Sequence, residues 1–366
     1  MYTEKELAVI AKRENNNKRK YLVVNPLQGK HVPVSPGKAL TMFEELAGLV
    51  KEAYSDETLL LVGFAETATA IGATLAVKLD TYYMQTTRED VKGVEYLFFS
   101  ESHSHATEQK LIQTDLDRVI DNIDRIVFVE DEVTTGNTIL KIVDLIERTY
   151  TKKIKFSVAS LLNGMNKISE KVYRDRQISL HYLVKTNHDS YTEVAESYKG
   201  DGTYYAENVQ EAQETAKIMA VSGYCNGRRL NRGRDYAASC EKLWKEIDKV
   251  VSFQENQKIL VLGTEEFMYP ALYVAKQIEQ MGYEVKSHAT TRSPIAVSSE
   301  AAYPLHTRYE LASLYDEERK TFLYDIGTYD LVLVITDAPI TDKGSKTLMY
   351  ALRNCGNENI KLIRWC

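Results

Sequence analysis

Short apolar runs that alternate with helical patterns constrain the fold of this chain more than any other feature of its sequence. Hydrophobic periodicity of this kind predicts buried strands separated by helices, which is typical of an α/β fold with a largely parallel sheet. The predicted strands are Tyr21–Val24, Leu59–Val62, Ile126–Val129, Ile154–Leu161, Ser179–Val184, Ile259–Leu262 and Leu331–Ile335. The alternation lapses between Ser197 and Gly233, so we expect a boundary near residue 215 and domains at 1–215 and 216–366.

The composition excludes several classes of protein. With 52 acidic and 46 basic residues the formal net charge is −6, so the chain lacks the basic excess of a nucleic-acid-binding protein. Its four cysteines form no Cys-x-x-Cys pair, which argues against a zinc site and a disulfide framework. The first residues lack the apolar stretch of a secretory signal, and no apolar run is long enough to cross a membrane. We therefore expect a cytoplasmic protein with neither a nucleic-acid nor a membrane partner.

Three landmarks recur in the same order in the two halves of the chain. The first is a strand, a glycine turn, an acid and a helix, and its Gly63 and Glu66 lie 200 positions before Gly263 and Glu266. The other two landmarks pair Arg88 of Gln-Thr-Thr-Arg with Arg292 of Ala-Thr-Thr-Arg, and Asp131 with Asp337. We expect an ancient duplication whose second copy is degenerate, because it has one acid and a proline-interrupted turn. The alternative is that two unrelated α/β domains share a common strand–turn–helix spacing.

The segment from Val127 to Thr138 runs from a buried strand through two acids into a turn and a predicted helix at Ile139–Arg148. A helix N-terminus offers unpaired N–H groups and the positive end of the helix dipole, and three threonines add hydroxyl groups. Glu130 and Asp131 are acceptors for the hydroxyl groups of a sugar. The segment therefore predicts a sugar-phosphate site, and the alternative is an N-capped turn with surface carboxylates.

This pattern of a strand, two acids, two further residues and Thr-Thr-Gly-x-Thr resembles the 5-phosphoribosyl-1-pyrophosphate (PRPP) signature of type I phosphoribosyltransferases. The resemblance covers about residues 20–190 and implies a type I phosphoribosyltransferase-like parallel sheet, followed here by the second α/β domain. The PRPP-binding residues that it implies are Ala65, Glu66, Thr67, Thr69, Glu130, Asp131, Thr134, Thr135, Gly136, Asn137 and Thr138. The catalytic residues that it implies are Glu130, Asp131, Arg88, His103 and His105.

The roles of these residues follow from the resemblance. The loop after Gly63 would bind the pyrophosphate through backbone amides, and Arg88 would neutralise its oxygens. His103 and His105 lie in the hydrophilic interval where these enzymes carry a loop that closes over PRPP. The cofactor would be Mg²⁺, held mostly by ligand oxygens and water, with no direct protein ligand and Asp131 reaching it through water.

The segment Thr291-Arg292-Ser293-Pro294 resembles the signature of the TRSP domain, which is fused behind phosphoribosyltransferase domains in bacterial gene clusters for tellurite resistance and stress. Together the two resemblances imply an enzyme that joins 5-phosphoribosyl to an unidentified base-like acceptor, in a pathway for a nucleoside-like metabolite. They also imply a homodimer. The alternatives are a non-catalytic sensor of PRPP or a nucleotide, and the reverse cleavage reaction. In the second domain we expect a relic pocket for a nucleotide, product or regulator, formed by Glu265, Glu266, Arg292, Ser293 and Asp337.

Three further segments carry weaker expectations. Residues 25–31 belong either to the acceptor pocket or to a contact with the other domain. The residues after the strand at 179–184 are candidates for the hood that selects the base, namely Tyr182, Lys185, Thr186 and His188. Four arginines between Arg228 and Arg234 would bind a phosphate or an acidic surface, or form a solvated linker.

Overall fold

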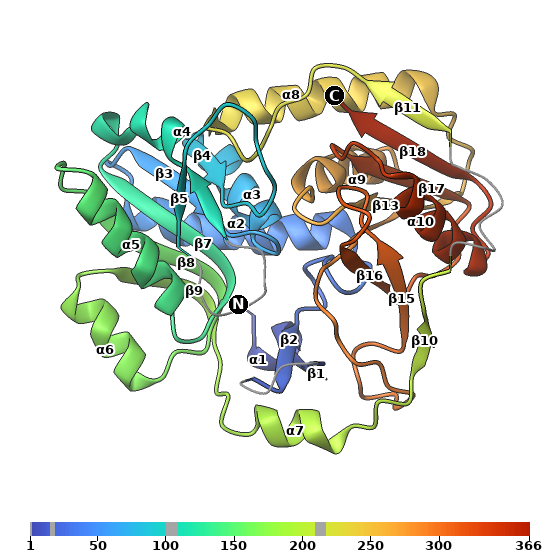
Figure 1. Cartoon of the computed structure of the whole chain (residues 1–366), viewed down its shortest axis with the longest axis horizontal. Helices are drawn as coiled ribbons and strands as arrows, with labels where there is room; N and C mark the ends of the chain where they lie inside the picture. The colour runs from blue at the N-terminus through green and yellow to red at the C-terminus, as the bar shows by residue number, and fades with distance from the viewer. Residues whose placement is uncertain (1, 15–18, 100–108, 209–216) are drawn as a thin grey trace. The chain divides into compact units, whose positions relative to one another are not determined.

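The computed structural model describes residues 2–14, 19–99, 109–208 and 217–366. It is a mixed α/β structure with parallel sheets, which confirms the fold class predicted from the alternating apolar runs (Figure 1). The chain forms two compact units. The first unit comprises Thr41–Thr186 and Cys225–Ala238, and the second comprises Tyr2–Leu40, Asn187–Tyr224 and Ser239–Cys366. Neither unit is continuous in sequence, and the expected boundary near residue 215 lies inside the middle segment of the second unit.

The first unit is built on a six-stranded sheet with the order β12-β4-β3-β7-β8-β9. Its strands are parallel except for β12, which pairs with β4 in the antiparallel direction. The strands are β3 (Leu59–Gly63), β4 (Tyr82–Gln85), β7 (Arg125–Val133), β8 (Lys155–Asn163), β9 (Ser179–Lys185) and β12 (Asn231–Arg232), with a separate hairpin of β5 (Tyr96–Phe98) and β6 (Lys110–Ile112). The helices are α2 (Pro36–Ala53), α3 (Thr69–Leu79), α4 (Gln113–Asp117), the 3₁₀ turn η1 (Ile120–Asn122), α5 (Asn137–Thr149) and α6 (Lys167–Asp175), and the division between the units falls inside α2.

The second unit contains a five-stranded parallel sheet with the order β11-β18-β17-β13-β14 and a three-stranded sheet with the order β10-β15-β16. The strands are β10 (Thr203–Tyr205), β11 (Ile218–Val221), β13 (Lys258–Gly263), β14 (Glu284–Ala289), β15 (Thr307–Ala312), β16 (Lys320–Tyr324), β17 (Leu331–Thr336) and β18 (Ile360–Trp365), besides the hairpin β1 (Val9–Lys12) and β2 (Tyr21–Val24). The helices are α1 (Glu4–Leu7), α7 (Tyr191–Ser197), α8 (Gly233–Val250), α9 (Tyr269–Gln280) and α10 (Asp342–Asn354), and the division between the units falls inside α8.

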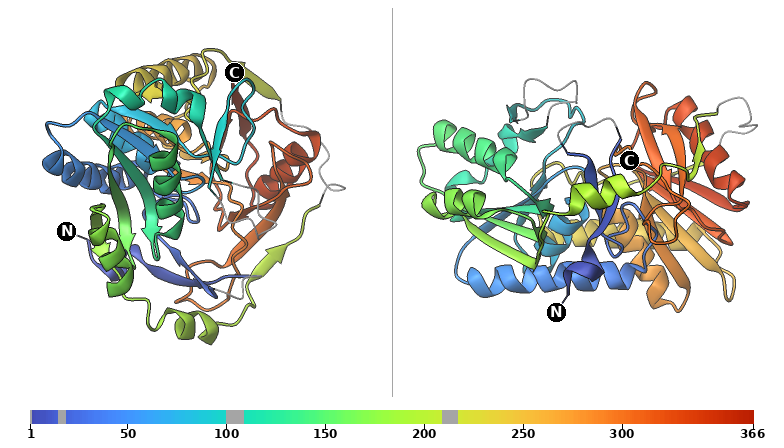
Figure 2. Two further views of the ribbon diagram at one scale, coloured as in Figure 1. Left: turned by 60° about the vertical axis from the view of Figure 1, so that its left-hand side comes forward. Right: turned by 90° about the horizontal axis from the view of Figure 1, so that it is seen from below.

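The central strands of both large sheets are buried along almost their whole length. Every residue of β3 and β17 is buried, as are the first five residues of β7. Such continuous apolar strands are expected where helices cover both faces of a parallel sheet. The hairpin β1–β2 packs against α7 within the second unit (Figures 1 and 2). Its Ala11 and Val24 share an apolar core with Ile295 and Tyr324, which explains why Tyr2–Leu40 belongs to this unit.

The arginine cluster of residues 228–234 is part of the first unit. Arg229 donates to both carboxylate oxygens of Asp115, at 2.5 and 2.7 Å, and Asp115 is completely buried. Although burial acts to raise the pKa of Asp115, hydrogen bonds from Arg229 and the Leu230 amide lower it below its ordinary value. The acidic partner of this cluster is therefore a residue of the same chain.

The structure also bears on membrane-spanning helices and on the state of the cysteines. In the described ranges, no helix has both the length and the apolar character needed to cross a membrane. All four cysteines lie in the described part of the chain, and none of them forms a disulfide with another.

Candidate functional site

The strand order of the first unit reverses beside β3. The chain passes from β3 to β4 on one side and later forms β7 on the other side of β3. In an open α/β sheet, a reversal of this kind leaves a crevice beyond the carboxyl ends of the two strands, and ligands bind there. The loops after β3 and β7 start at that edge, where the Phe64 amide donates to the Val129 carbonyl at 3.0 Å. The topology thus brings together the two loops that the sequence singles out.

Strand β7 extends past its predicted end at Val129. The ladder with β8 continues through the pairs Glu132–Leu162 and Val133–Asn163, so Glu130 and Asp131 lie in the last part of the strand. The turn Thr134–Gly136 follows, and α5 begins at Asn137 with Gly136 as its N-cap at a φ of 70°. The N-cap residue Gly136 has no side chain to cap the helix, and the Asn137 amide donates a long hydrogen bond of 3.4 Å to Thr135 Oγ1; Thr135, Asn137 and Thr138 are exposed. The start of α5 therefore presents exposed polar groups and the positive end of the helix dipole to an anion, with one amide held only by a long bond to Thr135.

Tyr173 supports this turn and was not predicted from the sequence. It lies on α6 and is completely buried, and its hydroxyl donates to the Gly136 carbonyl at 2.7 Å. A Cβ atom on Gly136 would lie only 2.1 Å from that hydroxyl oxygen. The hydrogen bond from Tyr173 holds the turn in place, and residue 136 must be glycine because the Tyr173 hydroxyl occupies the space of a Cβ atom. Nothing in the sequence around Tyr173 distinguishes it from any apolar position of an amphipathic helix.

The carboxyl group of Glu130 is electrostatically unusual. Burial raises the pKa of Glu130 well above its ordinary value, and the nearby charges of Asp131 and Glu132 raise it further. Burial also raises the pKa of Tyr173, and the charge of Glu130 adds to that shift. Perturbed titration of this kind is concentrated at functional sites, where polar groups await a ligand.

We expect Glu130→Gln to stabilise the protein at neutral pH. Because the folded-state pKa of Glu130 is raised, the unfolded state loses this proton first as the pH rises. Glu130 therefore lowers the free energy of unfolding increasingly above its ordinary pKa of about 4.3. The gain in the variant should be about 1.4 kcal/mol for each unit of pKa shift at pH 7.5 and should disappear near pH 4. Urea unfolding at both pH values measures it.

The control for this variant is Glu147→Gln on α5. Glu147 is exposed and forms a surface ion pair with Arg176 at 2.8 Å, so its substitution should change stability little at either pH. A gain for Glu130→Gln that is equal at both pH values would contradict the explanation by a raised pKa.

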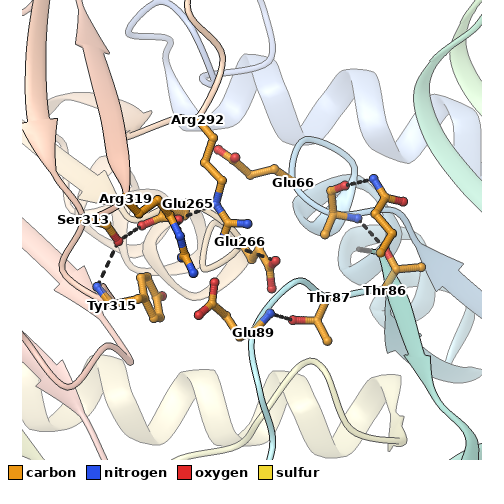
Figure 3. A network of polar contacts seen from close by, with 12 residues as sticks. Glu66, Thr86, Thr87, Glu89, Glu265, Glu266, Arg292, Ser313, Tyr315 and Arg319 are labelled. Carbon is orange, nitrogen blue, oxygen red and sulfur yellow. Dashed lines mark hydrogen bonds and ion pairs between the residues drawn. The ribbon is translucent and has the colours of Figure 1, made fainter. Parts of the chain in front are cut away.

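The loop after β3 is fixed against the end of β4. The Ala65 amide donates to Thr86 Oγ1 at 2.8 Å (Figure 3). The Thr86 amide donates to the Gly63 carbonyl at 3.0 Å. Within the loop, Thr69 Oγ1 donates to the Glu66 carbonyl at 3.1 Å. The hydroxyl of Thr69 therefore shapes the loop itself. Ala65, Glu66, Thr67 and Thr69 all lie at the sheet edge that also carries Glu130 and Asp131.

Arg88 follows β4 at the same edge. Its neighbour Thr87 forms an antiparallel bridge with Lys110, the first residue of β6. Lys110 forms an ion pair with Asp90, and its ammonium nitrogen lies 4.6 Å from the centroid of the Tyr96 ring. Lys110 is thus engaged with its own hairpin and the segment before it. His103 and His105 lie outside the described residues.

The residues predicted for the second-domain pocket follow three adjacent strands of the second unit. Glu265 and Glu266 follow β13, Arg292 and Ser293 follow β14, and Asp337 follows β17. The structure thus places them all at one edge of the sheet, and several of them contact one another. Arg292 Nε lies 2.5 Å from a Glu265 carboxylate oxygen, and Arg292 Nη2 lies 3.6 Å from Glu266. Asp337 accepts hydrogen bonds from Tyr224, at 2.6 Å, and from Tyr315, neither of which was predicted.

The weaker expectations concern residues that belong to different units. Lys30, in the segment 25–31, is buried and donates to the carbonyls of Glu265 and Thr290 at 3.1 and 3.0 Å. This segment therefore packs against the part of the second unit that follows β13 and β14. His188 also belongs to the second unit, where its Nδ1 lies 2.8 Å from the Tyr21 hydroxyl. Lys185 forms an ion pair with Glu170 at 2.6 Å in the first unit.

The sequence of this chain matches two known protein families. A family model described as phosphoribosyl transferase matches residues 7–191, which is 185 of the 366 residues. The chain belongs to this phosphoribosyltransferase family. A second model, described as the TRSP domain C-terminal to that transferase domain, matches residues 227–352 and confirms the predicted fusion. The phosphoribosyltransferase is therefore an enzyme of the pentosyltransferase class.

Three solved structures similar to this phosphoribosyltransferase are adenine phosphoribosyltransferases. The enzyme from Rhodothermus marinus is 17% identical, with a TM-score of 0.36 over 50% of this chain and 96% of that one. The enzyme from Giardia lamblia, complexed with 9-deazaadenine, is 16% identical, with a TM-score of 0.36 over 50% and 95%. The enzyme from Trypanosoma brucei, in complex with AMP, pyrophosphate and ribose-5-phosphate, is 15% identical, with a TM-score of 0.34 over 50% and 77%. No curated protein sequence matches the chain.

Proposed function

We propose that the first unit transfers the 5-phosphoribosyl group of PRPP to a nitrogen or carbon nucleophile of a base-like acceptor and releases pyrophosphate. The observation that carries the proposal is the threonine-rich turn after β7. There, two carboxylates are followed by an exposed helix start whose N-cap residue is a glycine, beside a strand-order reversal. A pathway for a nucleoside-like metabolite, a homodimer and a cytoplasmic location remain predictions from the sequence.

In this proposal the start of α5 binds the 5′-phosphate of PRPP. The first-turn N–H groups and the positive end of the helix dipole favour an anion, and Gly136 supplies the left-handed conformation, with a φ of 70°, from which the helix starts. The hydroxyl groups of Thr134, Thr135 and Thr138 add donors to the same anion. The Tyr173 hydroxyl, bonded to the Gly136 carbonyl, keeps the turn in the conformation that presents these groups.

Glu130 and Asp131 would accept hydrogen bonds from the ribose hydroxyl groups. The bond from the anomeric carbon to the pyrophosphate oxygen breaks, a bond from that carbon to the acceptor forms, and the acceptor loses its proton to solvent. Positive charge develops on the ribose during this exchange, and two carboxylates already in place would stabilise it. Burial raises the pKa of Glu130, and hydrogen bonds from ribose hydroxyl groups or positive charge on the ribose would favour its ionised form.

The leaving pyrophosphate would lie at the loop after β3, with Arg88 as a bidentate donor to its oxygens. Mg²⁺ favours carboxylate, phosphate and water oxygens, and Asp131 supplies a carboxylate beside this loop, so the site fits the ion through a bridging water. In the described parts of the chain, no group of three or more His, Cys, Asp or Glu side chains is placed to hold a metal. When bound, the ion would neutralise charge on the departing pyrophosphate.

Calorimetric titration of PRPP and Mg²⁺ into the full chain, followed by pyrophosphate-release assays over a panel of bases, tests this function. We expect PRPP to bind at one site and one class of base to give turnover. PRPP binding without turnover on any base would favour a sensor. If the folded protein bound no PRPP, the assignment of the β7 turn as a phosphate site would be wrong.

A further inference from the structure

The second unit repeats the core of the first unit strand by strand. The order β4-β3-β7-β8 corresponds to β14-β13-β17-β18, with parallel pairing throughout. The registers also agree, because Leu59 is paired with Arg125 in the first unit and Ile259 with Leu331 in the second. Asp131 and Asp337 each lie six positions after the second member of the pair. The two acids therefore occupy corresponding positions at the sheet edge.

The loops after the first strand of each core repeat the same hydrogen bonds. The Ala65 amide donates to Thr86 Oγ1 at 2.8 Å, and the Glu265 amide donates to Thr290 Oγ1 at 3.1 Å. The amides of these two threonines donate to the Gly63 and Gly263 carbonyls, at 3.0 and 3.1 Å. Strand–turn–helix spacing shared by unrelated domains does not require such matching side-chain contacts. Ala65 in the first unit and Glu265 in the second therefore occupy equivalent positions.

The hairpins that follow these strands correspond as well. Thr87 bridges to Lys110, at the start of a β-hairpin strand, and Thr291 bridges to Phe322 in the same antiparallel manner. Arg88 follows the first of these threonines, and Arg292 follows the second. Arg88 and Arg292 are therefore equivalent positions in the two cores.

At the position of Ala65, the second unit carries a carboxylate enclosed by donors. The Glu265 side chain is 2% exposed and accepts from Arg292 Nε at 2.5 Å and Arg319 Nη1 at 3.1 Å, and the Ser313 hydroxyl donates to its other oxygen (Figure 3). We call these four residues the Glu265 cluster. Two guanidinium groups and a hydroxyl converging on one point form the arrangement that binds phosphate oxygens. Here the anion comes from the chain itself.

The corresponding phosphate and ribose positions of the second core are also occupied by the chain. The N-cap residue of α10, Thr341, accepts from the Gly344 amide through its side chain at 3.1 Å, whereas the N-cap residue of α5 is Gly136, which has no side chain. Asp337 accepts from the hydroxyls of Tyr224 and Tyr315. All three groups that would hold a phosphoribosyl ligand thus already have partners in the second unit.

We infer that the second unit is a duplicated phosphoribosyltransferase core whose pyrophosphate subsite is closed by the Glu265 carboxylate. The ligand class that this subsite would take without the carboxylate is inorganic pyrophosphate. The comparison with the loop after β3 rests on the proposed function of that loop, whereas the enclosure of Glu265 by two arginines does not. The wild-type chain accordingly has no pyrophosphate site in its second unit.

The test is to replace Glu265 by alanine, the residue at the equivalent position of the first unit. Calorimetric titration of inorganic pyrophosphate into the full-length Glu265→Ala protein should show one more binding site than the wild type has. Pyrophosphate should also raise the melting temperature of the variant more than that of the wild type. The matched control is Glu310→Ala, which removes a partly buried carboxylate paired with Lys320 at 2.7 Å but uncovers no pair of arginines. It should gain no site.

The experiment compares the number of pyrophosphate sites in the variant and in the wild type. Its result is therefore interpretable even if the first unit binds no PRPP. The added site should be lost again when Arg292→Ala is combined with Glu265→Ala. If Glu265→Ala alone does not fold, Glu265→Ala/Arg319→Ala leaves a single buried arginine, beside Glu266, and should show a weaker added site. An unchanged number of pyrophosphate sites in whichever of these variants folds would overturn the inference.

Discussion

Replacing Asp131 by asparagine should lower the turnover number of phosphoribosyl transfer about 10²–10³-fold while leaving the protein folded. The amide keeps the size and the hydrogen-bonding groups of the side chain but removes the negative charge that would stabilise the developing positive charge on the ribose. Because that charge exists mainly in the transition state, kcat should fall far more than the affinity for PRPP. Steady-state pyrophosphate release and calorimetric PRPP binding, measured on the same preparation, separate the two effects.

The matched control for this prediction is Asp144→Asn. Asp144 lies on α5, in the same unit, and forms an ion pair with Arg176. Its substitution changes the net charge equally but leaves the sheet edge untouched, so turnover should stay within about twofold of wild type, as expected for loss of a surface pair. Equal turnover in the Asp131 and Asp144 variants would exclude Asp131 from the reaction.

Substituting alanine for Gly136 should be the most destabilising single change near the site. The new Cβ atom would lie 2.1 Å from the Tyr173 hydroxyl oxygen and 2.5 Å from its ring carbon Cζ, and Gly136 has a φ of 70°. A left-handed conformation costs a non-glycine residue about 1–2 kcal/mol, and overpacking a filled site costs about 1–3 kcal/mol more. We expect a loss of about 2–5 kcal/mol in urea unfolding, with PRPP binding abolished.

Gly93→Ala separates the two causes of this loss. Gly93 has nearly the same φ, 74°, but a Cβ atom there would meet no heavy atom within 4 Å. It should therefore show only the conformational cost, about 1–2 kcal/mol, and retain PRPP binding. Equal losses at the two glycines would mean that Tyr173 moves away freely and does not hold the phosphate turn.

The sequence predicts those parts of the fold whose signal is local. Strands β3, β13 and β17 can be predicted from the sequence because both faces of each strand are buried, which makes their residues continuously apolar. Strands β14 and β18 were not predicted, because their sequences, Glu-Val-Lys-Ser-His-Ala and Ile-Lys-Leu-Ile-Arg-Trp, mix charged and apolar residues. Only their pairing with buried neighbours stabilises them as strands.

The same distinction applies to the candidate site. The turn after β7 is recognisable because strand, acids, threonines and glycine are consecutive in the chain. Tyr173, Ser313 and Arg319 could not be predicted, because each acts on a residue between 37 and 54 positions away and none stands in a distinctive local pattern. The residues expected to form the second-domain pocket do follow adjacent strands of one sheet, but local spacing gave no sign that Glu265 and Arg292 bind each other.

Because each unit is made of separate segments of the chain, neither unit can be completed until its last segment has been synthesised. The edge strand β4 receives its partner β12 only when residue 232 has been made, and buried Asp115 receives Arg229 only slightly earlier. Until then β4 is an open sheet edge, and Asp115 has only the more distant Arg118, at 3.6 Å, as a positively charged partner. Residues 2–40 are synthesised early, but the core that they join also contains Ile295 and Tyr324, which are synthesised much later. A chain divided at residue 215 would separate β12 and Arg229 from the strand and the carboxylate that they bind, and residues 2–40 from the core that they join.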